Sequence, residues 1–140
     1  MEFSDYLVRV RNNDPALTRL DLQNRVLSLN DVKELSEGLK YNTHLKYLNV
    51  SDNAMGAEGA FYIAQALEKN STLEYLNISW NDIGVTGMKH IIHALDHNRT
   101  LLYVVSGYNE VGYGEDALVE ELRQRLERNK QLRNERIRYP

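Results

Sequence analysis

The sequence predicts an α/β solenoid, in which similar units stack side by side and share one core. Residues 45–72 and residues 73–100 are two copies of one 28-residue pattern, and a fixed period of this size is typical of stacked repeats. Each copy opens with alternating apolar residues, as in a strand, and continues with apolar residues three and four positions apart, as on one helix face. Because neither unit can bury its apolar face alone, its neighbours must supply the core.

Strand and helix fall at equivalent positions in the two copies. The apolar positions of the first copy are Leu45, Leu48 and Val50 in the strand and Ala60, Ile63, Ala64 and Leu67 in the helix. Those of the second copy are Leu73, Leu76 and Ile78, then Met88, Ile91, Ile92 and Leu95. Gly59 and Gly87 hold matching places just before the two helices, where we expect a small residue to let helix and strand approach.

The pattern extends in both directions. Residues 17–44 form a further copy, and residues 101–131 form a fourth that is three residues longer. We expect the extra residues in the loop VGYGED, at 111–116. An asparagine recurs near the end of each unit, at Asn42, Asn70 and Asn98 and, three residues later in its unit, at Asn129. The sequence therefore predicts four repeats.

A solenoid needs a cap at each end, because its terminal repeats otherwise expose the core. Residues 1–16 are predicted to form a capping helix that begins at Ser4 or Asp5 and is broken at Asp14-Pro15. Its apolar face carries Phe3, Tyr6, Leu7 and Val10. At the other end, a helix with Val119, Leu122 and Leu126 on its apolar face is expected to lead into residues 132–140, a charged edge strand and basic tail.

These residues resemble a known family. The motif LxxLxLxxNxL, followed by a helix and repeated every 28 residues, is similar to the leucine-rich repeats of the ribonuclease-inhibitor type. The resemblance implies a horseshoe arc with a parallel sheet on the concave face and helices on the convex face. In that family the motif asparagine, here Asn53, Asn81 and Asn109, satisfies backbone groups in the turn after the strand. Arg25 stands at this place in the first repeat, and we expect Asn24 to replace the missing asparagine.

A second resemblance rests on residues 12–24, NNDPALTRLDLQN. Preceded by a short helix, this stretch looks like the start of the repeat domain of tropomodulins, which cap actin filaments. The resemblance implies an actin-binding domain.

Composition limits the remaining possibilities. The 140 residues suit a single domain, and the absence of cysteine excludes disulfides and thiolate metal sites. The chain has no apolar run of about 18 residues and its N-terminus lacks a signal-peptide core, so we expect a cytoplasmic protein with no membrane contact. Residues 123–140 carry seven basic and two acidic side chains. We interpret this tail as a solvated cap able to steer an acidic partner, and not as a nucleic-acid groove.

The sequence offers little for catalysis. It contains neither a GxSxG nor a GxxxxGK[ST] motif, so we expect no enzyme, no small-molecule substrate and no cofactor. His90, His93 and His97 share one helix face, where two imidazoles four residues apart can chelate Zn²⁺. Ordinary polar residues hold the same places in the preceding repeat, so we predict no metal at these histidines. A metal-dependent site there remains the alternative.

Strand geometry predicts a binding surface. If the aliphatic residues point into the core, the third and fifth places of each repeat must point out, with the eighth place at their border. Tyr and Trp dominate the energetics of protein interfaces, although Tyr also suits an exposed strand. The predicted partner-binding residues are Arg19, Tyr47, Tyr75 and Tyr103 in the third place, Asp21, Asn49, Asn77 and Val105 in the fifth, and Asp52, Trp80 and Tyr108 in the eighth.

The leading hypothesis is a non-enzymatic module that binds a partner protein on its concave face. Proteins of the resembled class use that face to cover a partner, sometimes an enzyme's active site, and similar repeats without other domains occur among effectors of intracellular bacterial pathogens. The two alternatives are a tropomodulin-like actin-binding domain and a metal-dependent site at the histidines.

Overall fold

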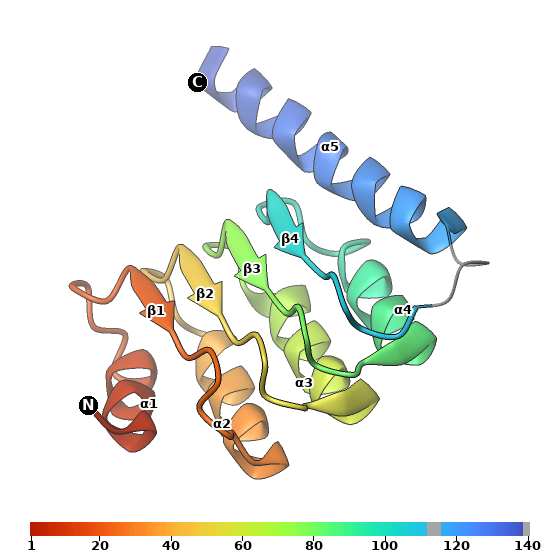
Figure 1. Ribbon diagram of the computed structural model, residues 1–140. Helices are drawn as coiled ribbons and strands as arrows, with labels where there is room; N and C mark the ends of the chain where they lie inside the picture. The colour runs from red at the N-terminus through yellow and green to blue at the C-terminus, as the bar shows by residue number, and fades with distance from the viewer. Residues whose placement is uncertain (112–115, 139–140) are drawn as a thin grey trace.

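The computed structural model describes residues 1–111 and 116–138. Its elements are α1 (Phe3–Arg11), β1 (Arg19–Asp21), α2 (Leu29–Leu39), β2 (Tyr47–Asn49), α3 (Gly56–Lys69), β3 (Tyr75–Asn77), α4 (Gly84–Ala94), β4 (Tyr103–Val105) and α5 (Asp116–Arg138). The four strands form one parallel sheet in the order β1-β2-β3-β4. Figure 1 shows this sheet along one side of an arc, with α2, α3 and α4 on the other side. The predicted α/β solenoid is confirmed.

The 28-residue period sets the register of the sheet. Leu20 is paired with Leu48, Leu48 with Leu76, and Leu76 with Val104, so equivalent residues of successive repeats lie beside one another. The three leucines are fully buried, whereas Val104 on the edge strand is only half-buried. The same register aligns the outward-facing residues, so the residues of the predicted binding surface lie in columns.

The motif asparagines join each turn to the next. The Asn81 amide donates to the carbonyls of Val50, Ile78 and Ser79 at 2.9–3.2 Å, and its oxygen accepts from the backbone nitrogens of Asn53 and Met55. Equivalent bonds surround Asn53 and Asn109. Each asparagine therefore satisfies buried backbone groups of its own repeat and of the preceding one, which would otherwise be costly to bury.

The turn of the first repeat is hydrogen-bonded by the motif asparagine of the second repeat. Asn53 Oδ1 accepts from the backbone nitrogens of Arg25 and Leu27, at 3.0 and 3.2 Å. The prediction that Asn24 replaces the missing asparagine is therefore wrong. Each motif asparagine bonds to the turn of the preceding repeat, so Asn53 of the second repeat satisfies the turn of the first.

Gly59 and Gly87 lie within the first turn or so of α3 and α4, not before these helices. A Cβ atom at position 87 would lie 2.6 Å from the Ile83 Cβ and 3.1 Å from the Ala60 Cβ. These glycines therefore make room for the preceding apolar residue and, at Gly87, for the neighbouring helix. The prediction that they bring helix and strand together is wrong.

Helix α1 covers the β1 end of the arc. Leu7 and Val10 are buried, and Phe3 and Tyr6 pack against the core, as the sequence predicts. The N-cap is Glu2, two residues before Ser4 and three before Asp5, the two predicted caps. The backbone nitrogen of Glu2 donates to the Asp5 carboxylate at 3.0 Å, so Asp5 closes the first turn from inside the helix.

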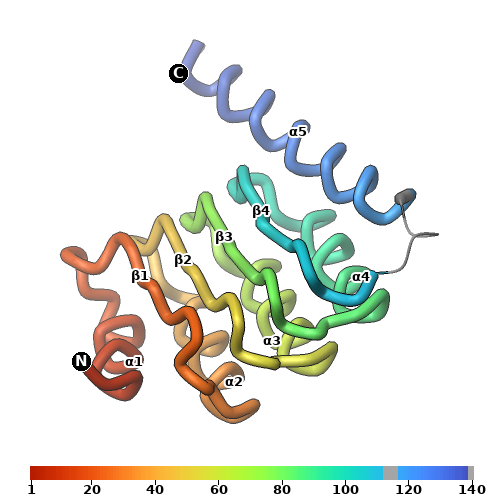
Figure 2. Tube along the Cα trace, viewed as in Figure 1, coloured from red at the N-terminus to blue at the C-terminus, as the bar shows by residue number. Residues whose placement is uncertain are grey.

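The other end is covered by the long helix α5, which continues to Arg138. The predicted edge strand at 132–140 is therefore wrong, since residues 132–138 belong to this helix. Figure 2 shows α5 running along the β4 edge in the direction opposite to the strands. Its buried residues are Leu118, Leu122, Leu126 and Asn129, whereas Val119 is exposed. Residues 112–115 of the predicted loop VGYGED lie outside the described part of the chain.

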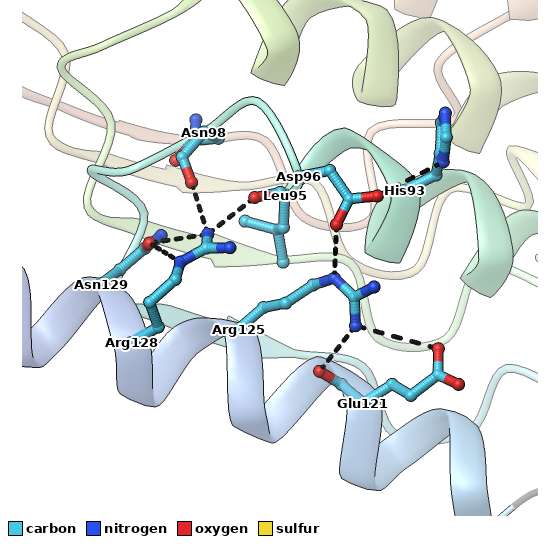
Figure 3. Close-up of polar contacts among 8 residues, drawn as sticks. All are labelled: His93, Leu95, Asp96, Asn98, Glu121, Arg125, Arg128 and Asn129. Carbon is cyan, nitrogen blue, oxygen red and sulfur yellow. Dashed lines mark hydrogen bonds and ion pairs between the residues drawn. The ribbon is translucent and has the colours of Figure 1, made fainter.

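Polar contacts hold α5 against the end of the third repeat (Figure 3). Arg128 Nη2 donates to the carbonyls of Leu95 and Asn98 at 2.7 and 2.9 Å. Asparagines make the equivalent bonds in earlier repeats, where Asn98 donates to Leu67 and Asn70. Asn129, which the sequence aligns with these asparagines, is buried, but it donates to Leu101 and accepts from Arg128. An arginine thus takes the expected role of the asparagine.

An ion pair reinforces this attachment. Arg125 Nε donates to Asp96 Oδ1 at 2.9 Å, joining α5 to the turn after α4 (Figure 3). His93 Nδ1 lies 3.5 Å from the other oxygen of Asp96. The Arg125 hydrogen bond is the main reason that the pKa of Asp96 is lowered, so the carboxylate stays charged below its usual range.

Among the described residues, no helix combines the length and the apolar character needed to cross a bilayer.

Candidate functional site

The third-place residues form a stack on the outward face of the sheet. The guanidinium carbon of Arg19 lies 3.5 Å from the ring centroid of Tyr47, and the rings of Tyr47 and Tyr75 are 4.4 Å apart and nearly parallel. Both tyrosines are half-buried. Burial raises the pKa of Tyr75, with a further contribution from Tyr47. We call Arg19, Tyr47 and Tyr75 the tyrosine stack.

Tyr103 is aligned with Tyr75 by the sheet register but has a different neighbour. The Lys130 nitrogen of α5 lies 4.5 Å from its ring centroid, and 52% of Tyr103 is exposed. Sequence reasoning placed all three tyrosines in one column but did not find Lys130, because the repeat pattern does not show how the last helix lies against the sheet. The helix therefore adds a positive charge at the end of the column.

The fifth-place residues mainly serve the turns. Oxygens of Asp21, Asn49 and Asn77 accept from the backbone nitrogen two residues later, at 3.3, 3.0 and 3.0 Å. Only 5% of Asn49 is exposed, so it offers a partner almost no surface. Asn77 is half-buried, while Asp21 and Val105 are exposed. These last two are the fifth-place residues with most surface to offer.

The eighth place carries two exposed aromatic side chains, Trp80 and Tyr108. Trp80 and Tyr108 stack with ring centroids 4.1 Å apart and an interplanar angle of 16°. They are 56% and 74% exposed. Both have left-handed backbones, with φ of 56° and 58°, a conformation that costs energy in non-glycine residues. The neighbouring asparagine bonds hold these turns, so the pair, which we call the aromatic border, is a preorganised surface.

Carboxylates accompany the aromatic border. A hollow of about 390 Å³ is lined by Trp80 and Tyr108 together with Asp52, Asp82 and Glu110. The pKa of Glu110 is raised mainly because its protonated carboxyl can donate a hydrogen bond to the Asp82 carboxylate, and next because of the negative charge of Asp82. Asp82 and Glu110 occupy the tenth place of their repeats, a column that sequence reasoning did not consider. An exposed, acidic and aromatic surface of this kind suits contact with a protein partner.

The histidines do not form a comparable centre. The His93 and His97 rings are 6.3 Å apart, whereas His90 packs with its ring centroid 5.2 Å from that of Phe61. In the described part of the chain, no group of three or more His, Cys, Asp or Glu side chains is placed to hold a metal ion. The three histidines lie on the surface of α4 and the turn after it.

Comparison with known proteins points to one family. The family model described as the TMOD/LMOD leucine-rich domain matches residues 1–137. A solved structure titled Leiomodin-1 Actin-Binding Site 2 has a TM-score of 0.83 at 24% identity, covering 99% of this chain and 95% of that one. A Caenorhabditis elegans tropomodulin C-terminal domain has a TM-score of 0.66 at 17% identity, covering 98% and 99%. No curated protein matches.

These findings confirm the predicted leucine-rich repeat fold. They do not support the narrower assignment to the ribonuclease-inhibitor type. The second resemblance, carried by residues 12–24, agrees with the family model and with both solved structures.

Proposed function

The chain belongs to the family of tropomodulin and leiomodin leucine-rich domains, and we propose that it binds actin without performing catalysis. The similar leiomodin structure is described as an actin-binding site, and tropomodulins cap actin filaments. Of the partners considered from the sequence alone, actin therefore has the most support. Actin binding also agrees with the expected cytoplasmic location.

The observation that carries the proposal on this chain is the exposed aromatic border. Trp80 is the single tryptophan of the sequence, and it is more than half exposed in a stack with Tyr108. Large aromatic side chains gain much from burial at an interface and lose little conformational entropy, since each has only two side-chain torsions. We propose that actin covers this border.

The sheet face would extend the same interface. Tyr103, Val105 and Asp21 are exposed there, and the tyrosine stack lies between them with its rings already ordered. Preordered side chains lower the entropy lost on binding. We therefore keep the concave-face hypothesis and place the centre of the interface at the aromatic border.

An enzyme as the covered partner, or a role as a bacterial effector, gains no support from the described residues or from the family. Likewise, the candidate metal-dependent site at His90, His93 and His97 has no observation in its favour. We retain neither as a second function.

The proposal is tested with purified actin. Sedimentation velocity measures binding of the domain to actin monomers, and the elongation and depolymerisation rates of labelled filaments measure binding at filament ends. We expect a complex in at least one assay, because the family relatives include an actin-binding site. If neither monomers nor filaments respond to a large excess of the domain, the proposed function is wrong.

A further inference from the structure

A second pocket lies away from the aromatic border, at the end of the sheet where the strands begin. It has a volume of about 240 Å³ and lies between the residues that precede β2, β3 and β4 and the C-terminal part of α5. Because α5 runs antiparallel to the strands, its last turns lie on the side of the sheet where the strands begin (Figure 1). Four basic side chains line the pocket, and we call it the basic pocket: Lys46, Arg99, Arg133 and Arg136.

One carboxylate lies among these four positive charges. Glu74 lies in the pocket with one oxygen 3.7 Å from Lys46 Nζ and the other 3.7 Å from Arg133 Nη1. In the described part of the chain, Arg99 and Arg136 have no carboxylate within ion-pair distance. Arg136 instead donates to the Arg99 carbonyl at 3.4 Å, which brings the two residues together. The pocket therefore holds a net excess of positive charge.

The positive charge of Arg99 also affects Arg128 on α5. The pKa of Arg128 is lowered, first by burial and next by the positive charge of Arg99. Like charges held close together destabilise one another, so this end of the molecule would gain from a bound anion.

Hydroxyl groups complete the lining. Ser71, Thr72 and Thr100 lie beside the basic side chains. Thr100 Oγ1 is buried, and within the described residues it has no hydrogen-bond partner. A buried hydroxyl without a partner is costly and is uncommon in folded proteins. The pocket thus combines unpaired cations with an unsatisfied polar atom.

We propose that the basic pocket binds a phosphate group, carried by a soluble molecule or by a lipid headgroup. Glu74 already pairs with Lys46 and Arg133, and the two cations left without a carboxylate match the charge of about −1.5 to −2 that a phosphate monoester carries. Its three acceptor oxygens suit the planar, two-pronged guanidinium groups of Arg99 and Arg136. This inference is independent of actin binding, because the basic pocket shares no residue with the aromatic border.

The test is calorimetric titration with inorganic pyrophosphate at low ionic strength, where salt screens charges least. The wild type should bind with one-to-one stoichiometry. The double variant Arg99→Gln/Arg136→Gln keeps polar side chains but removes both unpaired charges, and should bind about tenfold more weakly or worse, a loss of roughly 1.4 kcal/mol.

The matched control is Lys33→Gln/Arg123→Gln. It removes the same net charge from α2 and α5 at positions outside the pocket, and should bind pyrophosphate as tightly as the wild type. All four replaced side chains are exposed, so thermal unfolding should be nearly unchanged and affinities are compared between folded proteins.

Vesicles distinguish the two sources of phosphate. Phosphatidylcholine vesicles that contain phosphatidylinositol bisphosphate are compared with vesicles given equal surface charge by phosphatidylserine. A preference for the phosphorylated vesicles that the arginine variant loses assigns a lipid headgroup, whereas pyrophosphate binding without such a preference assigns a soluble ligand. The proposal is overturned if pyrophosphate fails to bind stoichiometrically, or if both double variants weaken binding equally. No arm contains actin, so failure here leaves the actin proposal standing.

Discussion

At the scale of single residues, buried asparagines connect one repeat to the next. Asn81 is fully buried and bonds to five backbone groups that come from two successive repeats. Removing its side chain would leave these groups without partners, in a place that water cannot easily reach. Each unsatisfied buried group costs about 1–3 kcal/mol, so this one position should have a large effect on stability.

We predict that Asn81→Ala lowers the free energy of unfolding by about 3 kcal/mol or more. Urea unfolding followed by circular dichroism measures the change. Asn134→Ala is the control, because Asn134 is exposed on α5 and its loss should change stability little. Equal stability of the two variants would show that the asparagine bonds are not what holds the turns.

The sequence predicts some of these residue roles but not others. The stacking of Tyr47 on Tyr75 follows from the period, because a fixed repeat length sets the register of a parallel sheet. The role of Arg128 could not be predicted, since it depends on where the last helix lies and how far an arginine side chain reaches. The burial of Asn49 was also missed, because strand alternation says which side a residue faces but not how deep a curved sheet places it.

At the scale of elements, the close packing of α3 and α4 depends on glycine. Gly87 lies in α4 opposite Ala60 of α3. In an unconstrained helix, replacing glycine by alanine stabilises by about 1 kcal/mol. Here the added Cβ would lie 2.6 Å from that of Ile83 and 3.1 Å from that of Ala60, closer than carbon atoms pack without displacement.

Gly87→Ala should therefore destabilise the protein by about 1–3 kcal/mol, as overpacked core positions do. The control is Gly107→Ala, where an added Cβ meets nothing within 4 Å. Thermal unfolding of both variants checks the sign. A stabilised Gly87→Ala protein would mean that helix propensity outweighs the close approach of the two helices.

The attachment of α5 should weaken at low pH. The Arg125 hydrogen bond is the main cause of the lowered pKa of Asp96, so the stabilisation by this carboxylate is present above its ordinary pKa of about 3.9. It is lost as the pH falls through the lower, folded-state pKa. Both side chains are partly exposed, which limits the effect.

We expect Asp96→Asn to be less stable than the wild type at neutral pH and to approach it as the pH falls below about 4. Thermal unfolding across this pH range gives both curves. A constant difference between the curves at every pH would contradict an ionic role for Asp96.

The end of the chain shows why boundaries of elements were harder to predict than their existence. Residues 132–138 were predicted as an edge strand because each earlier repeat is followed by one. The segment contains neither glycine nor proline, so nothing in it ends the helix, and α5 continues through it. The repeat pattern does not predict the structure of a terminal unit, since the last unit must cover the core instead of extending it.

At the scale of the whole molecule, the arc leaves two chemically different surfaces. The turns after the strands carry the aromatic border and its carboxylates, whereas the end where the strands begin carries the basic pocket. The architecture was predictable because four similar units repeat the same information. The partner was not, because an exposed tryptophan indicates an interface without naming what covers it, and the family match was needed to favour actin.

The most direct test of this account is the affinity for actin of three folded proteins. Trp80→Ala/Tyr108→Ala removes the aromatic border, and Phe61→Ala/His93→Ala removes an aromatic ring and an imidazole from α3 and α4 on the opposite side of the sheet. If actin covers the border, the first variant should bind about thirtyfold more weakly than the wild type, the cost of roughly 2 kcal/mol typical of central aromatic anchors. The second should bind as the wild type does. Unchanged affinity in the first variant together with a loss in the second would contradict the concave-side interface.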